Sequence, residues 1–191
     1  ACDDYQPVSR DQAGTVRLQE LAGACKALGI RRWEALGYPD GRLAHSNRRS
    51  LEAELVKWIR TLRPQVVVTC YPEGEAGHPD HDTVARVTTK AYLGAGHARR
   101  FPEHLREGLT PWQPLKLYYA IPPDPELASK IRTKRPFTVV DTSAYIEAKL
   151  RAMRCHASQK ECSETFAAAV YSNPHSTESF HLAHSRLPCV E

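Results

Sequence analysis

The chain has 191 residues, of which 41% are hydrophobic and 25% are charged, a composition that excludes collagen and coiled coils and argues against wholesale disorder. Lys and Arg outnumber Asp and Glu by 26 to 22, and the resulting formal charge of +4 is too small to indicate a nucleic-acid-binding protein. No window approaches the roughly 18 apolar residues of a membrane-spanning helix, so we expect no transmembrane segment.

The six cysteines are dispersed along the chain and form no CxxC pair. A disulfide framework is therefore not expected, which favours a reducing compartment. We predict a cytoplasmic protein on this basis.

Two amphipathic helices are predicted in the first third of the chain. The segment Ser9–Gln12 matches a capping box, and the apolar positions after it recur at helical spacing until Gly29, which is typical of a helix end. Leu51–Leu62 repeats the helical spacing, with Ser46 or Asn47 as the N-cap.

The run Val66–Cys70 is apolar and rich in β-branched residues, which predicts a central strand of a parallel sheet covered on both faces. The elements expected after it are a helix over 80–94, strands over 115–121 and 137–140, a helix capped by residues 141–143, and an edge strand over 179–183. His181 and His184, three residues apart on that last strand, should point to opposite faces. Alternating elements of this kind indicate one α/β domain of Rossmann-like type, in which ligands bind beyond the carboxyl ends of the strands.

The segment Gly77–His81 lies directly after the predicted central strand, where that rule places a ligand site. Pro79 suits the first turn of the next helix because its missing N–H would have no partner there. His78 and His81 could then project into one crevice, one as a zinc ligand and the other as an acid or base. The alternative is that both are ordinary capping or surface histidines.

At this point the sequence resembles a known family. Gly77-His78-Pro79-Asp80-His81 after a hydrophobic strand is similar to the second signature of the LmbE-like or PIG-L zinc deacetylases, which remove acetyl groups from N-acetylglucosamine-type substrates. Three supporting stretches, which extend the resemblance over roughly residues 9–165, are the helix Arg17–Ile30, the loop Leu36–Leu43 and the helix end His156–Gln159.

The resemblance implies a Rossmann-like three-layer α/β sandwich with a mainly parallel sheet, and it assigns roles to individual residues. His81 corresponds to a zinc ligand. His78 corresponds to the histidine that polarises the carbonyl or holds the developing oxyanion, and Asp80 to the carboxylate that orients it. Arg17 and Asp40 stand where family members contact sugar hydroxyls. The implied cofactor is Zn²⁺.

Structural alternatives stay open for the two sugar-contact positions. Arg17 could be a helix-surface residue that pairs with Glu20 or Glu54. Asp40 could belong to a Pro-Asp-Gly turn that needs no ligand.

The sequence departs from the family pattern in one respect. The family's first strand ends in a His-Pro-Asp-Asp motif, which supplies two zinc ligands and the general base, and this sequence contains no such motif. We expect residues 1–191 to be a single LmbE-like deacetylase domain that is incomplete at its N-terminus, as a piece of a larger protein. The other account is a protein that lacks this unit and keeps a binding or interaction module.

The expected function is zinc-dependent hydrolysis of the acetamide of an N-acetylglucosamine-type sugar or glycoconjugate by metal-activated water. The alternative is a catalytically inactive module that binds a sugar or a nucleotide. The expected partner is the small acetylated substrate, without nucleic acid, and the protein could be a homo-oligomer.

Overall fold

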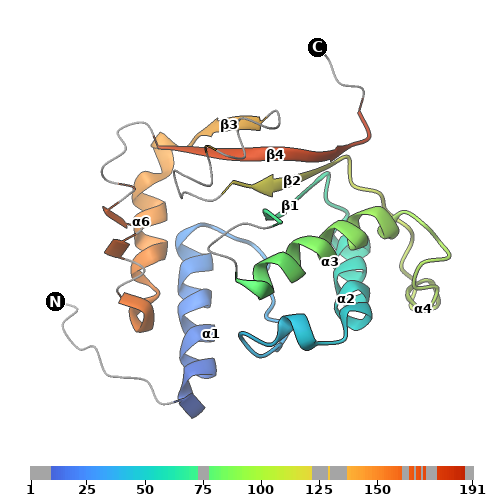
Figure 1. The fold of residues 1–191 in the computed structure, drawn as a ribbon, viewed down its shortest axis with the longest axis horizontal. Coiled ribbons are helices and arrows are strands. Elements are labelled where there is room, and N and C mark those ends of the chain that lie inside the picture. Colours follow the sequence, from blue (N-terminus) through green and yellow to red (C-terminus); the bar gives the residue numbers. More distant parts are fainter. Residues whose placement is uncertain are drawn as a thin grey trace. The chain divides into compact units, whose positions relative to one another are not determined.

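The computed structural model describes residues 10–72, 78–121, 129, 137–160, 164–165, 167–168, 170 and 176–187 (Figure 1). The predicted cap at Ser9 and the glycine of the Gly77–His81 motif lie outside these residues. The chain divides into two compact units, which we call the helical unit (residues 1–37 and 140–177) and the sheet unit (residues 38–139 and 178–191). Among the described residues, no helix has the length and apolar character needed to cross a bilayer.

The helical unit begins with α1 (Arg10–Ala27), which confirms the first predicted helix. Gly29 adopts a φ of +69°, and its N–H donates to the carbonyl of Lys26 at 3.2 Å. The N–H of Ile30 donates to the carbonyl of Cys25 at 2.9 Å. These two bonds form a Schellman motif, so Gly29 ends the helix as predicted.

Helix α6 (Ile146–Arg154) packs against α1 in the helical unit, with the short 3₁₀ turns η2 (Ser143–Tyr145) before it and η3 (Ala157–Gln159) after it. Glu20 on α1 is buried, and its carboxylate accepts hydrogen bonds from the N–H and the hydroxyl of Ser158 at 2.6 and 2.8 Å. The stretches around Arg17 and His156, which both carry the family resemblance, are therefore joined through one carboxylate.

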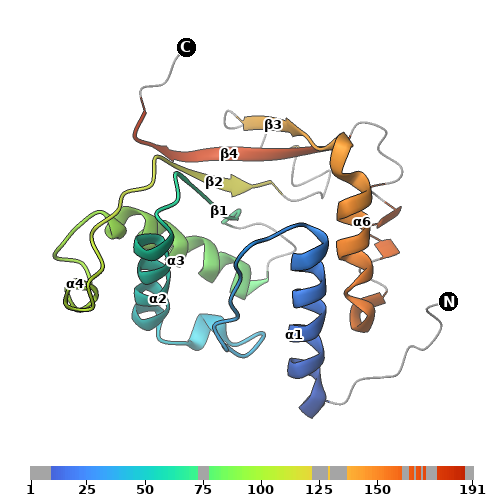
Figure 2. The same ribbon diagram turned by 180° about the vertical axis from the view of Figure 1, so that it is seen from behind.

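The sheet has the order β1 (Val66–Cys70), β2 (Lys116–Ala120), β4 (Thr177–Ser185) and β3 (Phe137–Asp141), as Figure 2 shows. β1 and β2 are parallel, whereas β2 and β4 are antiparallel. The fold is thus α/β with a mixed sheet, so the expectation of a mainly parallel sheet is not met in the described strands. The last predicted strand exists, but it lies inside the sheet and not at its edge.

β1 is an edge strand within the described sheet, so the prediction of a central strand covered on both faces is wrong here. Val66 and Val68 are 46% and 52% exposed, while Val67 between them packs against the hydrophobic core. The continuous apolar run could not distinguish these cases, because it marks a strand without saying which of its faces is covered.

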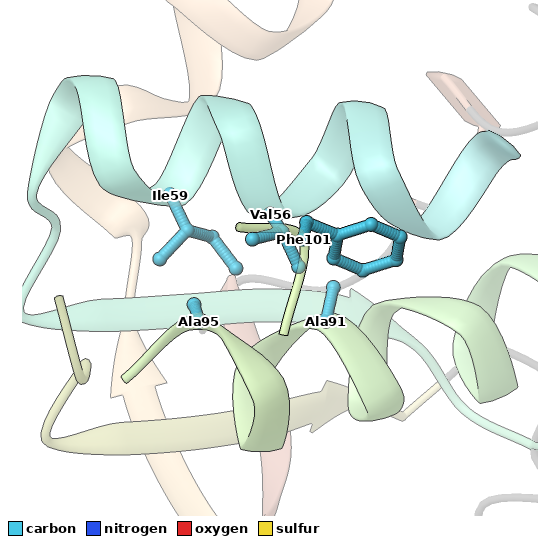
Figure 3. Packing of buried hydrophobic residues seen from close by; sticks show 5 residues of the cluster. All are labelled: Val56, Ile59, Ala91, Ala95 and Phe101. Atoms are coloured by element: carbon cyan, nitrogen blue, oxygen red, sulfur yellow. The ribbon is translucent and has the colours of Figure 1, made fainter. Parts of the chain in front are cut away.

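Helices α2 (Arg48–Leu62) and α3 (Pro79–Ala95) pack against each other, and α3 also contacts β1 and β2. Between these helices lies a core cluster, drawn in Figure 3, of Val56, Ile59, Ala91, Ala95 and Phe101. The two alanines on α3 leave room for the larger side chains of α2, so the helices approach closely.

Asn47 is the N-cap of α2, as the sequence predicts, because its side chain accepts hydrogen bonds from the N–H groups of Arg49 and Ser50. The described part of the sheet unit also contains the short helical turns η1 (Leu43–His45) before α2 and α4 (Glu103–Arg106) after α3.

Candidate active site

The start of α3 holds the histidine motif. His78 is the N-cap residue, and its Nδ1 accepts a hydrogen bond from the N–H of Asp80 at 3.3 Å. Pro79 occupies the first helical turn, as its missing N–H favours. Because Nδ1 accepts this bond, the neutral imidazole of His78 carries its proton on Nε2.

His78 and His81 lie together at this helix start. Their ring centroids are 5.1 Å apart, and the ring planes are inclined by 47°. The N–H of His81 donates to the carbonyl of His78 at 3.1 Å, which closes the first turn and holds the two residues on neighbouring positions. The structure therefore brings the two predicted histidines together, at the positive end of a 17-residue helix.

Asp80 is 8% exposed and has a different set of contacts from the one expected. Its carboxylate accepts hydrogen bonds from the N–H of Gly41 at 2.7 Å and from the N–H of Leu43 at 3.0 Å. The bond between Asp80 and His78 uses the backbone N–H of Asp80 and not its carboxylate. Asp80 thus joins the 39–43 loop to the histidine turn, a role that the sequence reasoning missed.

The 39–43 loop contains the predicted Pro-Asp-Gly turn. The N–H of Arg42 donates to the carbonyl of Pro39 at 3.2 Å, and Gly41 has a φ of +71°, which is accessible to glycine at little cost. Asp40 sits at the exposed corner of this turn. Asp40 therefore belongs to a Pro-Asp-Gly turn, as the structural alternative proposes. Contact between Asp40 and a sugar stays a prediction.

Tyr38 precedes this loop and contacts α2. Its hydroxyl donates to Oε1 of Glu54 at 3.2 Å. Burial, together with the nearby Glu54 carboxylate, raises the pKa of Tyr38 above its usual range, so the phenol remains a hydrogen-bond donor at neutral pH.

Arg17 belongs to the helical unit, whereas His78, Asp80, His81 and Asp40 belong to the sheet unit. Arg17 is exposed on α1 and forms no ion pair within the described part of the chain. The carboxylates of its two suggested partners bind elsewhere, that of Glu20 to Ser158 and that of Glu54 to Tyr38. Within the described residues, Arg17 thus forms no ion pair with Glu20 or Glu54. The role of Arg17 in sugar binding stays a prediction.

His181 and His184 point to the same face of the sheet, contrary to the expectation of opposite faces. The pairing of β2 with β4 shifts register between Leu117 and Tyr118, so that His184 lies opposite Leu117 and His181 opposite Tyr119. Leu117 and Tyr119 share a face because strand side chains alternate, and the extra residue on β4 brings both histidines to it. Nothing in the spacing of the histidines indicates this bulge.

The buried ring of His181 forms an aromatic cluster with Tyr71 and Tyr119. Its centroid lies 6.1 Å from each tyrosine ring, and the tyrosine centroids are 5.8 Å apart. The hydroxyl of Tyr119 is 2.8 Å from the hydroxyl of Thr89 on α3, so this cluster is joined to the helix that carries the histidine pair.

His81 fits a zinc site by its donor chemistry, since neutral imidazole is a common zinc ligand. A catalytic zinc is held by three protein ligands. Among residues 10–72, 78–121, 137–160 and 176–187, no group of three or more His, Cys, Asp or Glu side chains is placed to hold a metal ion. The role of His81 as a zinc ligand therefore stays a prediction.

Comparisons with known proteins support the family resemblance that the Gly77–His81 motif indicates. Residues 3–92 match the PIG-L family, described as GlcNAc-PI de-N-acetylase. A 1D-myo-inositol 2-acetamido-2-deoxy-alpha-D-glucopyranoside deacetylase from Thermobifida fusca is 31% identical over an alignment of 217 positions, which covers 92% of this chain and 73% of that relative. The chain belongs to the PIG-L family. A relative of the same name from Thermobispora bispora is 35% identical over 78% of this chain and 60% of its own length. The chain thus spans about three fifths of the length of several of the relatives it matches.

A solved structure extends this comparison of PIG-L relatives to the fold. The chain is similar to an N,N'-diacetylchitobiose deacetylase from Pyrococcus horikoshii with a TM-score of 0.73, over 94% of this chain and 67% of that one. Sequence identity over this alignment is 21%, so the likeness concerns the fold.

Proposed function

We propose that this PIG-L chain is a zinc-dependent hydrolase that removes the acetyl group from an N-acetylglucosamine-type sugar or glycoconjugate. The observation that carries the proposal is the pair of His78 and His81. Their ring centroids are 5.1 Å apart at the start of α3, the helix that follows β1 in the chain. The names of the relatives support it, because they are deacetylases of a 2-acetamido-2-deoxy-glucopyranoside. The proposal treats residues 1–191 as one Rossmann-like domain.

His81 would be a metal ligand. Zinc, when bound, lowers the pKa of a coordinated water toward neutrality and polarises a carbonyl oxygen. The short turn from His78 to His81 would hold the ligand beside the group that acts on the substrate.

His78 would stabilise the negative charge that develops on the amide oxygen. Its Nδ1 already accepts the N–H of Asp80, so Nε2–H is the donor that remains for the substrate. The ring is exposed, which leaves this donor accessible. A preorganised donor of this kind lowers the barrier by roughly 3–4 kcal/mol.

Asp80 would be a positioning residue. Its backbone N–H fixes the imidazole of His78, while its carboxylate holds the 39–43 loop against the same turn. That loop would carry Asp40 toward the sugar hydroxyls, with Arg17 as the second sugar contact.

The test combines zinc analysis with an assay of amine release from an N-acetylglucosaminyl substrate, on the full-length protein, including any segment that precedes residue 1, purified without a chelator. We expect stoichiometric zinc that is lost in His81→Ala, and a kcat about 10²–10³-fold lower in His78→Ala with zinc retained. His45→Ala, an exposed histidine in η1, is the matched control and should match the parent.

Protein without zinc, or His78→Ala turning over within severalfold of the parent, would contradict the proposal. Thermal stabilisation by N-acetylglucosamine that a chelator does not change, in protein without turnover, would instead support the inactive sugar-binding module.

A further inference from the structure

A concave site lies along α3 between Thr83 and Lys90. It is a pocket of about 450 Å³ in the sheet unit, and we call it the basic pocket. Its lining comes from the start of α2, the segment after β1, the centre of α3 and β2, namely Arg48, Pro72, Thr83, Arg86, Val87, Thr89, Lys90 and Tyr119.

The lining of the basic pocket is positively charged. It includes Arg48, Arg86 and Lys90 and no acidic residue. Arg86 forms an exposed ion pair with Asp82 one turn earlier on α3, at 2.7 Å. Within the described residues, neither Arg48 nor Lys90 forms an ion pair with a carboxylate. Two of the three cations thus keep their charge available to a ligand in the pocket.

The position of Arg48 is unfavourable for the stability of α2, which indicates that this residue has another role. It occupies the first turn of α2, where the helix dipole is positive and a cation is unfavourable, and that turn contains no acidic residue. The neighbouring Arg49 lies over the ring of Phe101, 5.5 Å from its centroid, which explains that side chain by packing. Arg48 has no such contact in the described chain. A bound anion would offset both its charge and the dipole.

Hydroxyl groups also line the pocket, but their hydrogens are used within the protein. The hydroxyl of Thr89 donates to the carbonyl of Ala85 at 2.7 Å and therefore accepts from the hydroxyl of Tyr119 at 2.8 Å, and the hydroxyl of Thr83 donates to the carbonyl of Pro79. Val87 and Pro72 supply apolar wall between these groups. The cations are thus the groups of this pocket that can donate to phosphate oxygens.

We propose that the basic pocket binds a phosphate-type oxyanion. The pocket extends along α3 from Thr83, two residues beyond His81, to Lys90, nine residues beyond it, and the latter separation corresponds to about 13.5 Å along the helix axis. The inference does not rest on the proposed deacetylation, and its test uses binding alone.

The experiment titrates the 191-residue chain with inorganic phosphate by calorimetry, with sodium chloride holding the ionic strength constant. We expect saturable binding that weakens about tenfold in Lys90→Gln and in Arg48→Gln, because each substitution removes a charged hydrogen-bond donor. The matched controls are Lys26→Gln and Arg99→Gln, exposed residues outside the pocket that carry the same charge. These controls should bind like the parent, since screening weakens distant charges.

A second titration uses N-acetylglucosamine 6-phosphate and separates the sources of the oxyanion. Equal affinity for the ester and for inorganic phosphate supports a site for the free anion, whereas tighter binding of the ester supports a site for the phosphate of a larger ligand. In both cases the pocket variants must lose affinity and the controls must keep it. Absence of saturable binding, or equal weakening in pocket variants and controls, would overturn the proposal.

Discussion

At the scale of single residues, Asp80 joins two parts of the chain that are far apart in sequence. Its buried carboxylate accepts from Gly41 and Leu43, 39 and 37 residues away. Hydrogen bonds to a charged group contribute about 1.5–3 kcal/mol each to stability, and a buried carboxylate without them is costly. The residue therefore holds the 39–43 loop against the histidine turn through backbone groups, so the loop's own side chains remain available for other contacts.

Asp80→Asn tests this link. An amide has one acceptor oxygen in place of two, so one of the two N–H groups loses its partner and the free energy of unfolding should fall by about 1.5–3 kcal/mol. Urea denaturation measures this change, and amide exchange at Gly41 and Leu43 should speed up. Asp82→Asn, which removes a more exposed carboxylate from the same helix turn, is the control. Unchanged exchange at both amides in Asp80→Asn would contradict the link.

His104 makes stability depend on pH. Its ring is 4% exposed and Nδ1 lies 3.3 Å from Nη1 of Arg60. Burial, and then the charge of Arg60, lower the pKa of His104 below its usual value of 6.5. The unfolded chain consequently takes up a proton at this histidine before the folded protein does. Stability is thus complete above pH 6.5 and falls as the pH drops below it toward the lowered pKa.

His104→Asn should reduce this pH dependence, because the amide oxygen can accept from Arg60 without titrating. We expect the loss of Tm between pH 7 and pH 5, measured by calorimetry, to be smaller in the variant than in the parent. His97→Asn, at an exposed position of the same segment, should keep the parent's profile. Identical profiles for the parent and His104→Asn would show that other groups carry the dependence.

At the scale of elements, Arg60 connects α2 to the end of α3 and the segment after it. The side chain is 2% exposed, and burial lowers its pKa. Its guanidinium donates to four backbone carbonyls, those of Ala95, His97, Arg100 and Phe101. The planar fork matches this ring of acceptors, which explains why a charged residue lies in the seam between two helices.

Arg60→Lys should destabilise the protein by about 3–5 kcal/mol, since an ammonium group reaches fewer of the four carbonyls and leaves buried acceptors without donors. Chemical denaturation measures the change. Arg63→Lys, one turn later and exposed at the C-cap of α2, is the control and should cost less than about 1 kcal/mol. Similar losses in the two variants would show that the carbonyl contacts contribute little.

At the scale of the whole molecule, the side chains of β1 show which face of the described sheet is covered. Val67 packs against the core cluster, whereas Val68 is 52% exposed. Val67→Thr should cost about 1–3 kcal/mol because it buries a hydroxyl, and Val68→Thr should change stability by less than about 0.5 kcal/mol. Denaturation of both variants checks this. Equal costs would indicate that both faces of β1 are covered, as its composition predicts.

Much of the secondary structure and the histidine turn could be predicted from the sequence. The cap at Asn47, the helix end at Gly29 and the start of α3 at His78-Pro79 are set by groups within a few residues of one another. The same locality places His78 and His81 on one turn. The comparisons confirm the family that this segment indicated.

The strand order and the contacts that position the site could not be predicted in this way. The register shift that turns His181 and His184 to one face arises in the pairing of β2 with β4. The same holds for the bonds of Asp80 and for the carbonyls around Arg60, which lie 35 to 41 residues away along the chain.

The sequence by itself determined where helices begin and end and that His78 and His81 share one helical turn, because those signals depend on neighbouring residues along the chain. Only the tertiary structure decided that the Asp80 carboxylate binds the 39–43 loop, that β1 exposes Val66 and Val68, and that Arg48 and Lys90 line one pocket. The physical reason is that burial and long-range hydrogen bonding depend on how separate elements pack, which one residue pattern does not specify.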